Sequence, residues 1–222
     1  KDADIRGQVS SGIGYVRRRY GADSGFMAYF QTFTNTNADP AILRKYYEET
    51  FAQADFKLAI ISTRPDCLPD DVIGLLSDLN SKIEIWVELG VQSANDRTLE
   101  LIRRGHDFSS VVDAVSRLHS SGIRTAAHLI LGLPGEGICD FRMTAEKISR
   151  LPFSAIKIHN LLVLKNTPLA ESYLKDSSFV HPMNEYEYAD VLIDFLSRIP
   201  QEWPLMRINT DAPDNQIIAP KW

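Results

Sequence analysis

The stretch FSSVVDAVSRLHSSGIRTAAHLIL, residues 108–131, places the clearest helix of the sequence directly before a clear strand. Three valines and Leu118 recur at helical spacing, which gives the first half of the stretch one apolar face. Gly122 is typical of the residue that ends a helix, and the apolar run from Ile123 to Leu131 is typical of a buried strand. The stretch therefore predicts one helix–strand unit.

The same alternation continues on both sides of this unit. Short apolar runs are separated by amphipathic stretches, with no repeat of solenoid period and no low-complexity segment between them. Strands that alternate with helices predict a parallel sheet joined by right-handed crossovers. The expected strands are 26–31, 56–62, 83–89, 123–131, 154–162 and 205–209, and the expected helices are 2–19, 40–53, 69–79, 95–103, 108–120, 138–150 and 184–198.

Six strands in sequence favour an α/β fold of the partial TIM-like barrel type, with an open doubly wound sheet as the alternative. The first expected strand is not followed by G-x-G-x-x-G, which weakens the case for a dinucleotide-binding sheet. Asp39 before Pro40 and Asp107 before Phe108 are expected helix N-caps.

The composition bounds the class of protein. With 222 residues, 44% of them apolar, the chain can bury one sizeable core, so we expect a single domain over residues 1–222. The net charge of −5 does not favour a nucleic-acid protein, although the basic patch Tyr15–Gly21 is either a solvated helix end or a phosphate contact. No membrane span or signal peptide is evident, so we expect a cytoplasmic protein without a membrane partner.

Polar side chains lie at or just beyond the ends of the expected strands. In a parallel barrel the carboxyl ends of the strands form one face, and binding sites are built there. We therefore expect these groups to converge on one mouth and to bind a polar small molecule. The candidate residues are Gln31, Thr32, Arg64, Glu88, Gln92, Arg104, His128 and Gly132.

The chemistry of these groups suits a zwitterionic ligand that carries a nucleoside. Arg64 and Arg104 can each hold a carboxylate in a bidentate fork. Glu88 and Gln92 suit an ammonium group or hydroxyls, and His128 suits a sugar hydroxyl or a ring nitrogen. A glycine at the end of the fourth strand lets the backbone approach a flat ligand.

Structural roles remain open for several of these residues. Glu88 is also explained as an ion-pair partner at the barrel mouth, with Arg64 as the expected partner. His128 and His159 are also explained as satisfied structural histidines, and Cys67 as an ordinary loop thiol.

Five motifs carry a family resemblance. In order they are AYFQTFTNT (28–36), TRPDCLPD (63–70), WVELGVQ (86–92), DRTLELIRRGHD (96–107) and HLILGLPGE (128–136). Together they resemble the radical S-adenosylmethionine (SAM) superfamily, in the branch of the Elongator catalytic subunit and of bacterial proteins described as Fe–S oxidoreductases. The resemblance covers residues 25–167, and weakly IAPKW at 218–222.

The resemblance implies a partial (β/α)6 barrel that lacks its first strand and cluster loop within this chain. It implies an enzyme in which a four-iron four-sulfur cluster cleaves SAM reductively to a 5′-deoxyadenosyl radical, which takes hydrogen from a substrate. An external electron donor is implied as a partner. The substrate is unknown, and the Elongator branch makes RNA a possible one.

The resemblance also implies roles for particular residues. Gln31 and Thr32 match positions that contact the methionine amino group, and Gln92 matches a glutamine that contacts SAM. Arg104 matches an arginine for the methionine carboxylate, and His128 matches a polar residue against the ribose. The stretch that contains Gly132 would pass beside the adenine, whereas the glutamate of some relatives is replaced by a serine at position 62.

The cysteines depart from the family pattern. The chain has only Cys67 and Cys139, whereas the cluster needs three cysteines close together. We therefore expect the cluster ligands to lie upstream of Lys1, in a longer protein of which this chain is a fragment. Alone, the fragment is expected not to cleave SAM.

Two other functions remain open. The first is a cluster-less module of the same fold that binds a nucleotide or another protein without catalysis. The second is an ordinary barrel lyase or epimerase that uses Lys157 or His159 as its base.

Overall fold

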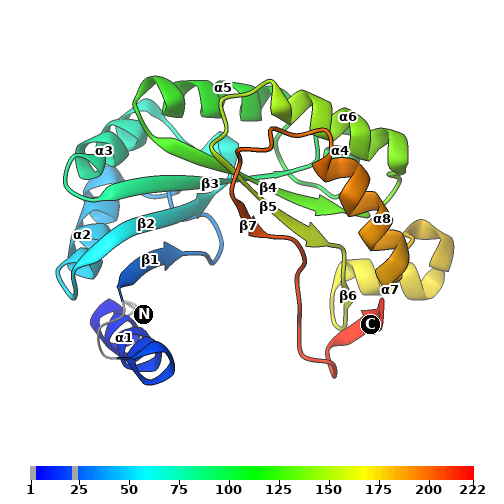
Figure 1. Ribbon diagram of the computed structural model, residues 1–222, viewed down its shortest axis with the longest axis horizontal. Coiled ribbons are helices and arrows are strands. Elements are labelled where there is room, and N and C mark those ends of the chain that lie inside the picture. Colours follow the sequence, from blue (N-terminus) through cyan, green and yellow to red (C-terminus); the bar gives the residue numbers. More distant parts are fainter. Residues whose placement is uncertain (1–3, 22–24) are drawn as a thin grey trace.

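The computed structural model describes residues 4–21 and 25–222. Six parallel strands form one curved sheet, in the order β1-β2-β3-β4-β5-β7, and helices cover its convex side (Figure 1). This half-barrel confirms the predicted α/β fold. None of the described helices combines the length and the apolar character that a membrane-crossing helix needs.

The strands and helices follow the predicted alternation. The strands of the sheet are β1 (Phe26–Phe30), β2 (Phe56–Thr63), β3 (Glu84–Gln92), β4 (Arg124–Leu131), β5 (Ala155–Asn160) and β7 (Leu205–Arg207). The helices are α1 (Ile5–Tyr20), α2 (Pro40–Phe51), α3 (Asp70–Asn80), α4 (Asp96–Leu101), α5 (Phe108–Ser120), α6 (Ile138–Ser149), α7 (Pro168–Lys175) and α8 (Glu185–Leu196). Shorter elements are the 3-10 turns η1 (Pro65–Cys67) and η2 (Ser177–Phe179) and the antiparallel strands β6 (Val163–Leu164) and β8 (Ile217–Ala219).

The expected elements are confirmed with small shifts at their ends. Residues 2 and 3 of the expected helix 2–19 lie outside the described residues, and the rest of that helix corresponds to α1. Both predicted N-caps form: the Asp39 side chain accepts from the backbone N–H of Ala41, and that of Asp107 accepts from Ser110. Each such bond satisfies one of the free N–H groups at a helix start.

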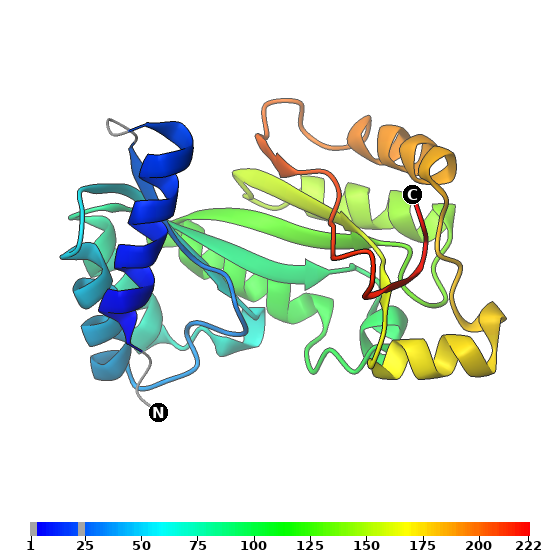
Figure 2. The same ribbon diagram turned by 90° about the horizontal axis from the view of Figure 1, so that it is seen from below.

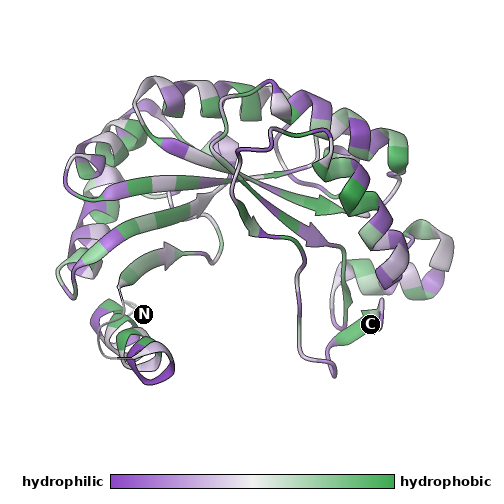
Figure 3. Ribbon diagram, in the orientation of Figure 1, coloured by the Kyte–Doolittle hydropathy of each residue, from purple (hydrophilic) through white to green (hydrophobic). Residues whose placement is uncertain are grey.

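The main core lies between the convex side of the sheet and the helices. Val87 and Leu89 on β3, Leu118 on α5 and Ile148 on α6 are all 0% exposed. Figure 3 shows hydrophobic residues along the strands and on the helix sides that face them. Burying each such side chain stabilises the fold by roughly 1.5–3 kcal/mol.

The register of the strands decides which side chains share the concave face. Glu88 on β3 pairs with Ser62 on β2, and His128 on β4 pairs with Lys157 on β5, which in turn pairs with Arg207 on β7. Register partners in a parallel sheet point to the same face. Tyr29 on β1 pairs with Ile60, two residues before Ser62, so the concave face gathers polar side chains from all six strands.

The two edges of the sheet are β1, which pairs with β2, and β7, which pairs with β5, among the described strands. Figure 2 shows α1 across the β1 end of the sheet, with α7, α8 and the last residues at the other end. A largely apolar groove of about 670 Å³ runs between α1, β1 and α2. The prediction of a further strand before Lys1 concerns sequence outside this chain and stays a prediction.

Candidate functional site

A charged layer crosses the concave side of the half-barrel. Lys157 on β5 donates from Nζ to Oε1 and Oε2 of Glu88 on β3, at 3.2 and 3.3 Å. It also donates to the hydroxyl of Tyr29 on β1 at 2.7 Å, and that hydroxyl donates to Glu88. Side chains from alternate strands form one layer, as in complete barrels.

Glu88 and Lys157 are only 2% and 3% exposed. Ser62 adds a fourth bond, from its Oγ to Glu88 Oε1 at 3.1 Å. The partner of Glu88 is therefore Lys157, and the expectation of an ion pair with Arg64 is wrong. Both carboxylate oxygens of Glu88 therefore already accept from protein donors, and the buried pair links β3 to β5. Burial, and then the bond to Glu88, raise the pKa of Tyr29.

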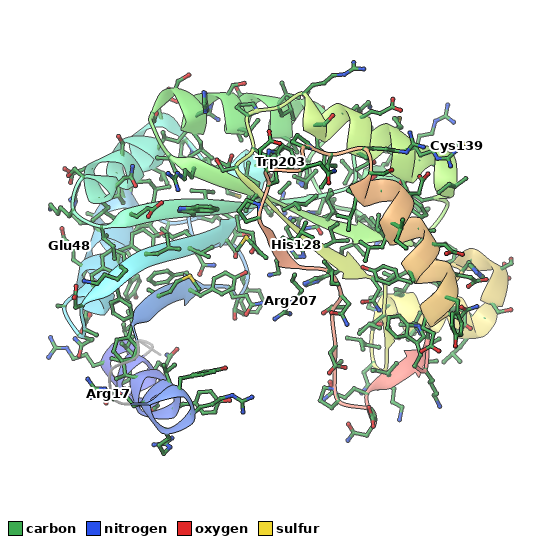
Figure 4. The ribbon with its side chains drawn as sticks, viewed as in Figure 1. Arg17, Glu48, His128, Cys139, Trp203 and Arg207 are labelled. Atoms are coloured by element: carbon green, nitrogen blue, oxygen red, sulfur yellow. The ribbon has the colours of Figure 1, made fainter. Side chains whose placement is uncertain are left out.

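Above this layer lies a pair of histidines from neighbouring strands. Nε2 of His128 lies 3.2 Å from Nδ1 of His159, with the ring centroids 4.4 Å apart in an edge-to-face arrangement. Burial, and then the charge of Lys157, lower the pKa of His128 to about 3. Burial and the neighbouring His128 lower the pKa of His159 to about 3 as well. Both rings are therefore neutral near pH 7. Figure 4 labels His128 at the centre of the concave side.

Arg104 brings a guanidinium without a carboxylate partner to the end of β3. Its Nη2 donates to the carbonyl of Gly90 at 3.0 Å, while its buried Nε has no hydrogen-bond partner. No described residue forms an ion pair with it. Burial, and then repulsion from Arg64, lower the pKa of Arg104. A half-buried guanidinium in this state has N–H donors that can bind an anion.

Gln92 stands beside Arg104 in a strained conformation. Its φ of 65° lies in the left-handed region that residues other than glycine rarely adopt. Its buried Oε1 has no hydrogen-bond partner among the described residues. A buried acceptor without a hydrogen bond lowers the stability of a protein by about 1–3 kcal/mol. The described residues supply no donor to this amide oxygen, so a ligand can supply one.

Gly90 makes room for both side chains. A Cβ atom at this position would lie 2.4 Å from Nη2 of Arg104 and 2.8 Å from Nε2 of Gln92. Only a glycine leaves the two side chains where they are. Gly90, Gln92 and Arg104 therefore form one cradle, which we call the β3 cradle.

Arg64 differs from Arg104 because its guanidinium group already binds a carboxylate of the protein. Its Nε and Nη2 donate to Asp66 at 2.9 and 2.5 Å, and Nη2 also reaches the carbonyl of Gly105 at 3.3 Å. The carboxylate that the sequence led us to expect at Arg64 is thus supplied by the protein itself.

The remaining predicted residues lie at other strand ends. Gln31 and Thr32 follow β1 directly and are exposed. Gly132 follows β4 with a φ of 96°, and a Cβ there would meet Met183 at 3.1 Å and Leu161 at 3.5 Å. The protein therefore covers the backbone of Gly132 with its own side chains, where we expected an approach for a flat ligand.

Sequence reasoning missed Tyr29, Gly90, Glu136 and Arg207. Tyr29 lies two residues before Gln31, so strand alternation alone would have placed both side chains on the same face of the sheet. Burial raises the pKa of Glu136 to about 7, and Ser93 donates to this carboxyl from the preceding strand's loop. Arg207 belongs to a short edge strand with a weak sequence signal.

The described residues do not fit a four-iron four-sulfur cluster. Cys67 and Cys139 are both free, and no group of three or more His, Cys, Asp or Glu residues in residues 4–21 and 25–222 can hold a metal ion. Figure 4 places Cys139 on the outer rim, away from His128.

The chain matches two sequence families. Residues 22–148 match the Radical SAM superfamily, and residues 153–222 match the Radical_SAM C-terminal domain. The chain is 41% identical over 200 residues to the uncharacterized protein YtqA of Bacillus subtilis, covering 90% of this chain and 62% of YtqA. It is 33% identical over 198 residues to protein YhcC of Escherichia coli, covering 89% and 63%. It spans less than two thirds of either relative.

Solved structures show the same fold. Elp3 of the archaeon Methanocaldococcus infernus, with an N-terminal deletion, superposes with a TM-score of 0.84 at 23% identity, over 97% of this chain and 55% of that one. Coproporphyrinogen III oxidase of Escherichia coli, a radical SAM enzyme, gives 0.62 at 19% identity, over 89% and 46%. From the match over residues 22–148, the chain belongs to the radical SAM superfamily.

Proposed function

We propose that this chain is the SAM-binding body of a radical SAM enzyme and that it binds SAM at the carboxyl ends of its strands. The observation that carries the proposal is the β3 cradle. It holds one guanidinium without a carboxylate and one amide oxygen without a donor, side by side over a glycine. The methionine end of SAM carries the two complementary groups, a carboxylate and an ammonium.

Each residue of the site has a chemical role in this proposal. Arg104 binds the methionine carboxylate, and Oε1 of Gln92 accepts from the ammonium group. Gln31 and Thr32 approach the same amino group from β1, and His128 lies against the ribose. Neutral His128 packs against the ribose through its ring without adding charge.

Three other predicted residues support the site without touching SAM. Glu88 closes the charged layer, Gly132 lies under Met183, and Arg64 fixes the neighbouring loop through Asp66 and Gly105. All three are saturated or covered by protein groups. The proposal therefore assigns the carboxylate to Arg104 instead of Arg64.

The redox centre of the proposed enzyme lies outside this chain. Because the two described cysteines do not fit a cluster, we propose that the ligands of a four-iron four-sulfur cluster come from protein beyond residues 1–222. The oxidoreductase activity and its external electron donor belong to that whole protein. We propose that residues 1–222 form one domain of it and that it is cytoplasmic.

RNA is the substrate class that the relatives favour. The chain is 33% identical over 161 residues to the tRNA uridine(34) acetyltransferase of Methanocaldococcus infernus, covering 71% of this chain and 29% of that enzyme. Arg17, Arg18 and Arg19 end α1, and none of them has an ion-pair partner among the described residues. Exposed Tyr15 and Tyr20 flank them. Guanidinium groups next to exposed rings suit a phosphate backbone.

The lyase alternative has less support. Lys157 is 3% exposed, and its ammonium group is already bound to Glu88 and Tyr29. The cluster-less binding module shares the β3 cradle with the main proposal. The two hypotheses differ in whether the whole protein cleaves SAM. An assay for 5′-deoxyadenosine under reducing, anaerobic conditions would distinguish them.

Calorimetric titration with SAM and S-adenosylhomocysteine tests the binding site. We expect Arg104→Ala and Gln92→Ala each to weaken binding by about tenfold or more, equal to about 1.4 kcal/mol. The matched control is Arg97→Ala, which removes an exposed arginine from nearby α4. Equal affinity in Arg104→Ala and Arg97→Ala would refute the assignment of the carboxylate.

A further inference from the structure

The positively charged side chain of Arg207 belongs to neither the charged layer nor the β3 cradle. The register of β5 and β7 places it beside Lys157, and it is exposed, as is Leu205 two residues before it. Its guanidinium forms no hydrogen bond or ion pair with another described residue. Figure 4 labels Arg207 on the open concave side, below His128.

None of the carboxylates in the described part of the chain forms a salt bridge with Arg207. The nearby carboxylate, Glu88, is bound to Lys157, and the charge of Arg207 acts on Tyr29, His128 and His159. Both histidines are neutral. Within residues 4–21 and 25–222, neither Arg104 nor Arg207 forms an ion pair, and the positive charges of both lower the pKa of His128.

The histidine pair adds one hydrogen-bond acceptor. Only one hydrogen fits between His128 Nε2 and His159 Nδ1, which lie 3.2 Å apart. His128 Nδ1 faces the carboxylate of Glu88 at 3.6 Å, which favours the hydrogen on Nδ1 and leaves Nε2 as the acceptor. His159 must then donate from Nδ1. Its Nε2 is buried, carries a lone pair and has no partner among the described residues.

We propose that Arg207 anchors an anionic oxygen group of the substrate, with an adjacent O–H or N–H of that substrate donating to His159 Nε2. The fork of an arginine binds carboxylate and phosphate alike, so the shared chemistry is an oxyanion beside a donor. The anion would lie across His128 from the β3 cradle. Naming it as part of the substrate rests on the proposed function, whereas binding of the anion itself does not.

Binding of small anions to the purified protein, without SAM, tests this site. The probes are lactate, a carboxylate beside an O–H; monohydrogen phosphate, an oxyanion with its own O–H; and acetate, which has no donor. The readout is the ring ¹⁵N and ¹H resonances of the histidines at constant ionic strength, assigned with His159→Gln. The variants are Arg207→Ala, Arg207→Lys and the control Arg124→Ala, which removes a concave-face arginine already paired with Glu84.

We expect lactate or phosphate to shift the His159 and His128 resonances in the wild type and in Arg124→Ala, and acetate to bind more weakly. Arg207→Ala should weaken binding about tenfold or more, and Arg207→Lys should fall between because it keeps the charge without the fork. If lactate binds more tightly than phosphate, the site favours a carboxylate; if phosphate binds more tightly, it favours a phosphate. Shifts of equal midpoint in Arg207→Ala, or no shift with any probe, would overturn the proposal. Since SAM is absent, either result leaves the β3 cradle to be judged separately.

Discussion

Lys157 binds both carboxylate oxygens of Glu88, at 3.2 and 3.3 Å, across 69 positions of sequence. The pair joins β5 to β3, and Tyr29 extends it to β1. Three alternate strands are thus tied together on the concave side of the sheet. The same layer supports the histidine pair above it, so the curvature of the half-barrel and the geometry of the candidate site depend on one buried ion pair.

Removing the cation of this pair should destabilise the fold strongly. Lys157→Met leaves Glu88 charged and buried without a counter-ion, so we expect the free energy of unfolding to fall by about 3–5 kcal/mol. Urea denaturation at neutral pH measures this loss. The matched control is Lys57→Ala, which breaks the exposed pair with Asp55 and should cost no more than about 1 kcal/mol. Similar losses in the two variants would show that the buried pair does not hold the sheet.

Gly90→Ala should damage the site more than the fold. The new Cβ displaces the ends of two flexible side chains, Arg104 and Gln92, so SAM binding should weaken about tenfold or more while the melting temperature changes little. Gly74→Ala is the control, because a Cβ at that position in α3 meets nothing within 4 Å. It should stabilise the protein by about 0.5–1 kcal/mol and leave binding unchanged. Unimpaired SAM binding in Gly90→Ala would contradict the β3 cradle.

The neutral histidine pair should make stability fall in mild acid. The pKa of His128 is about 3 in the folded state and 6.5 in the reference state. Below pH 6.5 the unfolded chain therefore takes up a proton that the folded chain refuses, and stability is lost as the pH falls. Each such group adds a slope of up to about 1.4 kcal/mol per pH unit.

Denaturation at a series of pH values from neutral to mildly acidic measures this slope. His128→Asn should flatten it, whereas the exposed His119→Gln serves as the control for losing a histidine elsewhere. A slope unchanged by His128→Asn would mean that the ring protonates in the folded protein.

Glu136 should give a pH effect of the opposite sign. Burial raises its pKa from 4.5 to about 7, so the folded protein keeps a proton that the unfolded chain releases. This contribution to stability is complete below pH 4.5 and is lost as the pH rises through 7. Glu136→Gln keeps an acceptor for Ser93 without the titration. We expect the variant to match the wild type in acid and to exceed its stability above neutral pH; a difference that does not vary with pH would be inconsistent with a raised pKa.

Periodicity predicted the fold because the helices and strands are strongly amphipathic or apolar. Residues 108–131 alone contain α5 and β4 almost to the residue. Helix α7 was missed although its start has a clear signal: Thr167 accepts from the N–H of Ala170, and Pro168 follows it. Its short length and the apolar residues before it made the segment resemble an extended loop.

The polar contacts were harder to predict because they depend on distant positions. Arg64 was the expected partner of Glu88, yet it lies past the end of β2, whereas Glu88 points into the concave face within β3. Lys157 reaches it only because β5 curves round to face β3. The role of Gly90 also required the structure, since what it excludes are the side chains of Arg104 and Gln92.

The structure of this protein with SAM or S-adenosylhomocysteine bound tests the central claim most directly. We predict that the methionine carboxylate lies within hydrogen-bond distance of the Arg104 guanidinium, with the ammonium group at Oε1 of Gln92. Arg104 Nε and Gln92 Oε1, which now have no hydrogen-bond partner, would then each have one. Density for the ligand elsewhere, with Arg104 still bound only to the Gly90 carbonyl, would contradict the account.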